Sequence, residues 1–212
     1  MGAKTAVELL ENQEISEQEA NYLLSFCNNI GPVYYISYAL PTLERQMKIP
    51  YLLGMYGIPL VYGFVLRYTL FRKMTCKIHE KTTKIHFSDN ILEQLDITIN
   101  SSLQSILMLG GYMILFNLIN ILPHLICGYS NGLIAQIMEI SGGLKISGNK
   151  TPFFSLCALS FGGLSCLAQT NSCLRETRLS IKTYLIHKLV ITSIMIGYLC
   201  VWRVVFPKVF LA

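Results

Sequence analysis

Charge is what this sequence has least of. Of its 212 residues, 14% are charged and 52% are hydrophobic, and the mean hydropathy is positive. Soluble domains carry roughly 25% charged residues. Three stretches, 20–43, 97–138 and 151–174, contain no Asp, Glu, Lys or Arg. Fully buried helices of a soluble protein are the alternative, but several such stretches in so short a chain favour a membrane protein.

Signatures of metal binding, disulfide frameworks and catalysis are also lacking. The seven cysteines form no Cys-x-x-Cys pair and mostly lie in apolar runs, so we interpret them as small buried hydrophobes. His124 and His187 stand alone beside predicted helix ends, without further metal ligands. No enzymatic activity, cofactor or metal site is therefore predicted. The basic residues gather between apolar runs, which is typical of loops beside a membrane and argues against a nucleic-acid partner.

The apolar runs predict an all-α protein whose helices cross a lipid bilayer several times. Ser16 and Glu19 form a capping-box pattern, so the first membrane helix is expected to begin near Glu17 and to stop at Pro41. Further spans are predicted over residues 51–71, 102–122, 152–170 and 184–206, with a weaker segment at 122–143. The basic stretch 72–84 is the best candidate for a cytoplasmic loop.

Two motifs interrupt the uncharged runs. In "NNIGP", residues 28–32, Pro32 lacks a backbone N–H and Gly31 adds freedom, so helical hydrogen bonds are expected to fail there. The motif "SFGG", residues 160–163, interrupts a later run. Irregular backbone at membrane depth is tolerated where it is buried in protein or lines a wet cavity. Two discontinuous segments in one chain indicate a transporter site where they meet.

The predicted substrate-binding residues belong to these two motifs and to the helix that follows the second one. They are Asn28, Asn29, Gly31, Pro32, Ser160, Gly162, Gly163, Ser165 and Gln169. The alternative is structural, with asparagines that bond to a neighbouring helix and small residues that allow close packing. Glu139 is a candidate for proton or sodium coupling, or it caps a helix at the membrane interface. Lys4 could neutralise a substrate carboxylate, or it is a loop charge.

Five motifs in this order carry a resemblance to a known family. They are "GAKTAVELL", "EISEQEANYLLSFCNNIGPVYYI", "LQSILMLGGYMILFNLIN", "MEISGG" and "LSFGGLSCLAQT". Together they resemble the YlbJ-type sporulation integral membrane proteins of the nucleoside-recognition, or Gate, group, over nearly the whole chain. The resemblance implies inverted repeats similar to those of concentrative nucleoside transporters, and a location in the cell membrane of a sporulating bacterium. The implied function is membrane transport of dipicolinic acid, a small aromatic dicarboxylate.

The resemblance also implies a division of the chain. In the family, the segment that matches "GAKTAVELL" is preceded by further membrane segments, so this chain resembles the C-terminal part of a family member. We expect residues 1–90 to end a first repeat and residues 91–212 to form a second, Gate-like repeat. A weak internal echo supports this division, with Ala3, Thr5, Leu9 and Glu11 matching Ala168, Thr170, Leu174 and Glu176 at one constant offset.

Two consequences for partners follow from this division. A homodimer or a missing N-terminal half is expected to complete the site, beside the lipid bilayer and the small-molecule solute. The alternative function is a non-transporting membrane scaffold, or half-protein, that assembles with a partner chain. The two functions differ in what they bind, since only the transporter binds a solute.

Overall fold

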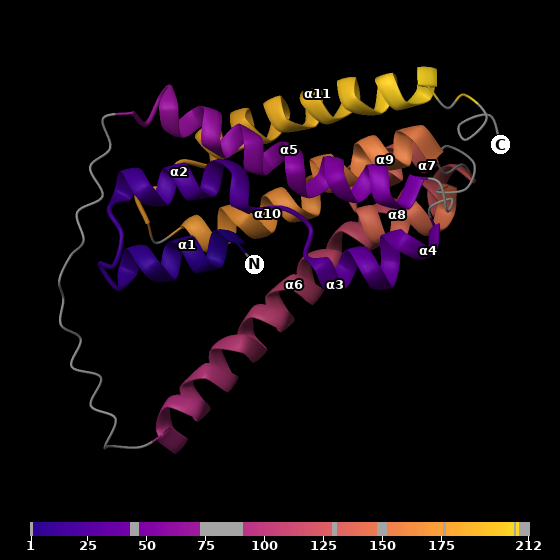
Figure 1. The fold of residues 1–212 in the computed structure, drawn as a ribbon. Helices are drawn as coiled ribbons and strands as arrows, with labels where there is room; N and C mark the ends of the chain where they lie inside the picture. Colours follow the sequence, from indigo (N-terminus) through magenta and orange to yellow (C-terminus); the bar gives the residue numbers. More distant parts are fainter. Residues whose placement is uncertain are drawn as a thin grey trace.

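The computed structural model describes residues 2–42, 47–72, 91–128, 131–147, 152–175, 177–205 and 207. Within these ranges every regular element is a helix (Figure 1). The predicted all-α class is therefore confirmed. The candidate cytoplasmic loop lies almost entirely outside the described residues, and the division near residue 90 stays a prediction.

The helices range from three residues to 37 residues. In chain order they are α1 (Gly2–Glu11), α2 (Glu17–Cys27), α3 (Pro32–Tyr34), the π-helical turn η1 (Tyr35–Ala39), α4 (Leu40–Thr42), α5 (Lys48–Tyr68), α6 (Ile91–Cys127), α7 (Gly132–Met138), α8 (Ile140–Ser147), α9 (Pro152–Phe161), α10 (Gly163–Leu174) and α11 (Ile181–Val205). α11 contacts α2, α5, α9 and α10, so it joins the early and late parts of the chain.

Four stretches of the described chain are long and apolar enough to cross a membrane. They are Lys48–Tyr68, Leu95–Ile126, Phe153–Leu174 and Ile181–Val205. The shortest has 21 residues and measures about 31 Å at ~1.5 Å per residue, which matches a hydrocarbon core of ~30 Å. The protein is therefore a membrane protein with several candidate transmembrane helices.

The beginning of α2 follows the predicted capping box. Ser16 Oγ accepts a hydrogen bond from the Glu19 backbone N–H at 3.3 Å, and Glu19 Oε2 accepts one from the Ser16 backbone N–H at 2.8 Å. The two bonds satisfy donors that the first turn of a helix otherwise leaves without a partner. The predicted start at Glu17 is confirmed.

The helix predicted to stop at Pro41 is described as far as Thr42, the last residue of α4 and one residue past the proline. The preceding turn is π-helical, and the Leu40 N–H donates to Tyr35 O, five residues earlier. A proline ring in an α-helix clashes with the carbonyl four residues before it. The wider π-helical turn relieves this clash, so the chain continues as a helix through the proline.

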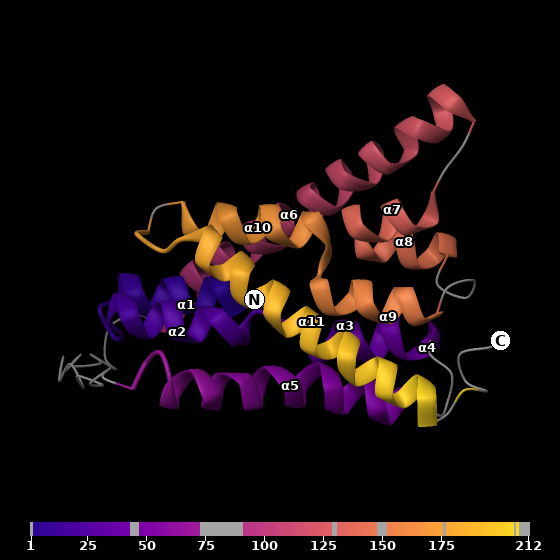
Figure 2. The same cartoon turned by 90° about the horizontal axis from the view of Figure 1, so that it is seen from above.

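The predicted span over 102–122 is too short. α6 has 37 residues and contains Pro123. It leaves the other helices at a steep angle in both views (Figures 1 and 2), and none of its apolar window Leu95–Ile126 is buried by the rest of the chain. The weaker segment at 122–143 divides into the end of α6, all of α7 and the beginning of α8.

Buried apolar side chains form two separate clusters. The first core consists of Tyr35, Ala39, Met47, Tyr51, Met55, Ile140, Leu144, Leu156, Leu159, Met195 and Leu199. The second core consists of Ala3, Val7, Ala20, Leu24, Leu174, Leu179 and Tyr184. Three segments, 24–35, 159–174 and 184–195, run from one core to the other. Their middle parts therefore lie between the two cores.

Among the described glycines, Gly143 of α8 lies nearest to the backbone of another helix, which is α7. This close packing yields a stability prediction. A Cβ on Gly143 would lie 2.4 Å from the Cα and N atoms of Gln136, which are backbone atoms that cannot move aside. We expect Gly143→Ala to lower the free energy of unfolding by about 1–3 kcal/mol, as overpacked cores do. Thermal unfolding in detergent measures this change.

Gly57→Ala in α5 is the matched control, because a Cβ there meets no atom within 4 Å. Alanine is favoured over glycine in helices by about 0.5–1 kcal/mol, so this variant should be as stable as the wild type or more stable. An equal effect of the two substitutions would contradict the close packing of α7 on α8.

Candidate functional site

The chain is interrupted between α2 and α3, and we call this interruption the first helix end. α2 ends at Cys27, and its C-cap Asn28 has φ −88° and ψ 73°, outside the helical region. α3 begins at Pro32, whose fixed φ suits the first position of a helix. Residues 28–31 between the two helices are not helical. Their backbone groups therefore need partners other than the helix itself.

The chain is interrupted again between α9 and α10, and we call this interruption the second helix end. α9 ends at Phe161, and Gly162 and Gly163 have φ values of +94° and +74°. A residue with a Cβ is strained in this left-handed region, so glycine at both positions permits the turn. The chain then continues as α10 from Gly163.

Asn28 joins three helices. Its side chain is buried, with 7% of the residue exposed, and Nδ2 donates to Thr170 Oγ1 on α10 at 2.8 Å and to Tyr184 Oη on α11 at 3.0 Å. Both donor hydrogens of the amide are used. The end of α2 is thereby tied to the helix that follows the second helix end.

Lys188 on α11 reaches the same place. It is 4% exposed, and its Nζ donates to Asn28 O at 3.2 Å and to Asn29 Oδ1 at 3.2 Å. A Cβ added to Gly162 would lie 3.8 Å from Lys188 Cε, so the lysine side chain passes near the second helix end as well. We call Asn28, Asn29, Thr170, Tyr184 and Lys188 the polar centre. It lies at the edge of the second core, which includes Tyr184, on the side of the first core.

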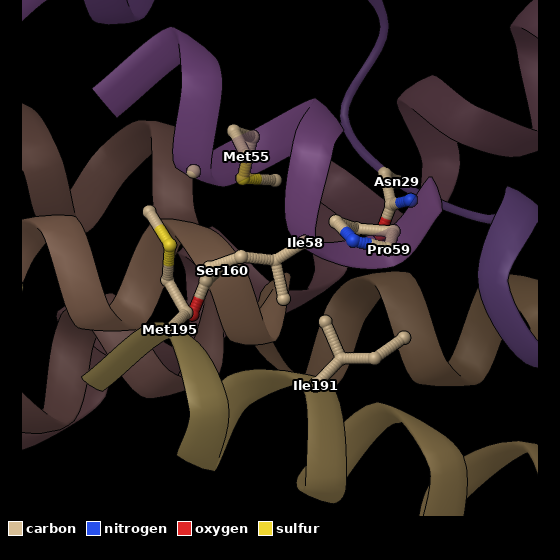
Figure 3. Close-up of a pocket in the computed structure, with 8 residues that line it drawn as sticks. Asn29, Met55, Ile58, Pro59, Ser160, Ile191 and Met195 are labelled. Atoms are coloured by element: carbon tan, nitrogen blue, oxygen red, sulfur yellow. The ribbon is translucent and has the colours of Figure 1, made fainter. Parts of the chain in front are cut away.

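A small cavity adjoins the polar centre (Figure 3). It is lined by Asn29 and Ser160 from the two predicted motifs, together with apolar side chains of α5 and α11 such as Pro59, Ile191 and Met195. Its volume is about 10 Å³, which is room for about one water molecule. In this conformation the cavity is too small for a larger solute.

The remaining predicted binding residues are dispersed. Gly31 and Pro32 are exposed, and a Cβ on Gly31 meets no atom within 4 Å. Gly163 packs against the end of α7, where its Cβ would lie 3.4 Å from Ile137 O. Ser165 and Gln169 lie on α10, and within the described residues neither forms a hydrogen bond with the polar centre. The structure therefore brings together Asn28, Asn29, Ser160 and Gly162 from the predicted set.

Glu139 lies between α7 and α8, and its hydrogen bonds go to residues outside the polar centre. It is 2% exposed, and its Oε2 accepts hydrogen bonds from Gly142 N at 2.6 Å and from Asn117 Nδ2 at 3.2 Å. The carboxylate therefore caps the first turn of α8, where the helix dipole favours negative charge. This is the capping role that the sequence left open, in a buried position.

Lys4 does not reach the polar centre either. It lies in α1, not in a loop, and its Nζ donates to Ser101 O at 3.1 Å, to Ser101 Oγ at 2.8 Å and to Ser105 Oγ. It also pairs with Glu8 on its own helix at 3.4 Å. Lys4 therefore ties α1 to α6.

Sequence reasoning missed Lys188, Tyr184 and Thr170. It also placed His187 at a helix end, whereas His187 is buried within α11, with Nδ1 2.7 Å from Tyr62 Oη. The signal for Lys188 was present, because an ionisable residue inside an apolar span is by default a functional candidate. In the described part of the chain, no group of three or more His, Cys, Asp or Glu residues is placed to hold a metal ion.

Comparisons of the chain with protein-family models, with curated proteins and with solved structures find no match. The class of the protein is therefore defined by its own structure. It is an all-helical membrane protein with a buried polar centre between two helix ends. The resemblance to the YlbJ-type family stays a prediction.

The hydrogen bonds of Asn28 generate a prediction for stability. Asn28→Ala removes the donor shared by two buried hydroxyl groups, so we expect the free energy of unfolding to fall by about 1–3 kcal/mol. The matched control is Asn21→Ala, since Asn21 is on the same helix and makes only an exposed bond to Glu17 O. That change should stay within about 0.5 kcal/mol. Equal losses, measured by thermal unfolding, would show that the buried bonds contribute nothing.

The hydrogen bond from Gly142 N to Glu139 gives a second prediction for stability. Glu139→Ala removes the acceptor of the Gly142 N–H, so it should cost about 1–3 kcal/mol. Glu139→Gln keeps an oxygen of the same shape and should stay close to the wild type. Thermal unfolding of the two variants side by side tests the cap. If glutamine destabilises as much as alanine, the negative charge rather than the cap is what the fold requires.

Proposed function

We propose that this protein is part of a membrane transporter for a small polar or anionic solute, with the binding site at the polar centre. The observation that carries the proposal is the convergence of two helix ends on Lys188. Broken helices that meet inside a membrane expose backbone groups and dipole ends, and transporters use these to hold polar solutes. No chemical step is part of the proposal.

The small volume of the cavity supports alternating access as the mechanism. A volume of about 10 Å³ holds one water molecule, so a solute can enter only after the helices around it separate. Alternating access would supply this separation, with one group of helices moving against the other around the site. The boundary between the two apolar cores is the natural place for it, because apolar packing is interrupted there.

The family resemblance suggests which solutes to test first. Dipicolinate and nucleosides are the solutes associated with the YlbJ-type and nucleoside-transporter groups, and a sporulating-cell membrane is the corresponding location. Glu139 stays a candidate for proton or sodium coupling, because it is a buried carboxylate among candidate membrane helices.

A second candidate function rests on α6. The apolar window of this helix has no residue buried by the rest of the chain, and a Cβ on Gly110 or Gly111 at its centre meets no atom within 4 Å. Close helix pairs in membranes use such small residues. A half-protein or scaffold that assembles with a partner chain or a second copy through α6 would have this feature.

Uptake into proteoliposomes tests the transporter. The purified protein is reconstituted, its folding is checked by thermal unfolding, and uptake of radiolabelled dipicolinate and nucleosides is followed. We expect uptake by the wild type and at least a tenfold reduction for Asn29→Ala, which removes a cavity-lining amide that accepts from Lys188. Asn21→Ala, on the same side of the break but with a side chain that only makes an exposed bond to Glu17 O, should transport at the wild-type rate.

Two outcomes would overturn the transporter. One is a folded protein that neither binds nor moves any of these solutes, and the other is full uptake by Asn29→Ala. Co-purification from native membranes separates the second candidate, because a scaffold would retain a second hydrophobic protein while showing no thermal stabilisation by solute.

A further inference from the structure

Lys188 is a buried cation in the first third of a candidate membrane helix. It lies seven residues after the first residue of α11, and 4% of it is exposed. Placing an ammonium group at such a position is costly unless other groups compensate its charge. Lysines near helix ends can extend to the membrane surface, but Lys188 turns inward to the polar centre instead.

The groups that Lys188 contacts do not balance its charge. Both of its hydrogen-bond acceptors, Asn28 O and Asn29 Oδ1, are neutral oxygens. Within the described residues, no carboxylate oxygen lies within 4 Å of Lys188 Nζ. A lysine ammonium has three N–H donors, so one donor remains after these two bonds.

The second helix end places more positive potential beside this lysine. Gly162 is the N-cap of α10, and the position of its missing Cβ is 3.8 Å from Lys188 Cε and 3.6 Å from Cys166 Sγ. The first amides of a helix have no carbonyl partner within it, and the dipole makes this end positive. The side chain of Lys188 therefore passes close to the N-terminus of α10.

We propose that Lys188 is the central residue of an anion-binding site at the junction of α2, α10 and α11. The ligand is a small anion, either a free halide or the carboxylate of a solute, which accepts from the third N–H of the ammonium. The inference deepens the proposed function, because it assigns the charge of the group bound at the same helix ends. It concerns binding alone, so it can fail or hold independently of transport.

The competing explanation is purely structural. Asn28 O is the carbonyl of the C-cap of α2, and a cation favours this end of a helix. Under this explanation Lys188 only caps α2, and anions have no effect on the protein. The two explanations differ in one measurable quantity, the dependence of stability on the anion.

The experiment measures thermal unfolding of the purified protein in detergent while single anions are titrated. The probes are chloride and acetate, with neutral acetamide as the control for acetate, and ionic strength is held constant with a bulky sulfonate buffer salt. A ligand at 100 times its Kd raises Tm by roughly 5–10 °C in a chain of this size. We expect such a rise with at least one anion and none with acetamide. A rise with chloride alone identifies a halide site, and a rise with acetate identifies a carboxylate site.

Variants assign the effect to Lys188. Lys188→Gln keeps a donor for Asn28 O but removes the charge, so the response to anions should disappear, whereas Lys188→Arg should retain it. Lys182→Gln is the matched control, because it removes the same charge from an exposed position of α11 and should respond like the wild type. Asn29→Asp tests the site without replacing the lysine. Its carboxylate would lie beside Lys188 Nζ, compensate the charge and abolish the response while the protein stays folded.

Two results would overturn the anion site. One is the absence of any anion-dependent rise in Tm in the wild type, and the other is an equal rise in the wild type, Lys188→Gln and Asn29→Asp. Anion binding without solute uptake would leave the inference intact and reject the proposed function. Uptake of a neutral solute by a protein whose Tm does not respond to anions would support the proposed function and reject the anion site.

Discussion

The hydrogen bonds from Lys188 to Asn28 and Asn29 are the interaction on which the centre of this protein depends. α2 ends among buried side chains, and the free carbonyl of its last turn would be costly without a donor. Lys188 supplies that donor from α11, and the Asn28 side chain in turn binds α10 and α11. One cluster of polar groups therefore joins α2, α10 and α11 at the end of α2.

This cluster explains why the molecule has two apolar cores. Each of the three segments that meet at the polar centre contributes side chains to the first core on one side and to the second core on the other. A polar boundary of this kind weakens apolar packing where it lies, so the two cores can move against each other more easily than the halves of one continuous core. The water-sized cavity at the boundary agrees with a closed arrangement of the two cores.

Charges outside the polar centre have structural partners. Glu139 caps α8 and binds Asn117 of α6, while Lys4 binds Ser101 and Ser105 of the same helix. These bonds attach α6 to α1 and to the junction of α7 and α8, although its apolar surface lies outside the bundle. Polar side chains therefore help to hold this helix, which also packs against α7 and α10, to the rest of the chain.

The amino-acid sequence by itself determined the class of protein, the helical content, the start of α2 at its capping box and the two helix ends, because these depend on composition and on local rules for capping, proline and glycine. It did not indicate the π-helical turn over residues 35–39 that precedes Pro41. It also did not indicate which polar residues would meet. Lys188 lies 160 positions from Asn28, and only the tertiary structure brings the ammonium to the end of α2. The motifs around Gly31, Pro32 and Glu139 pointed to the site as strongly, but these residues are not part of the polar centre. Partners in space, rather than neighbours in the chain, decide where a buried polar group is satisfied.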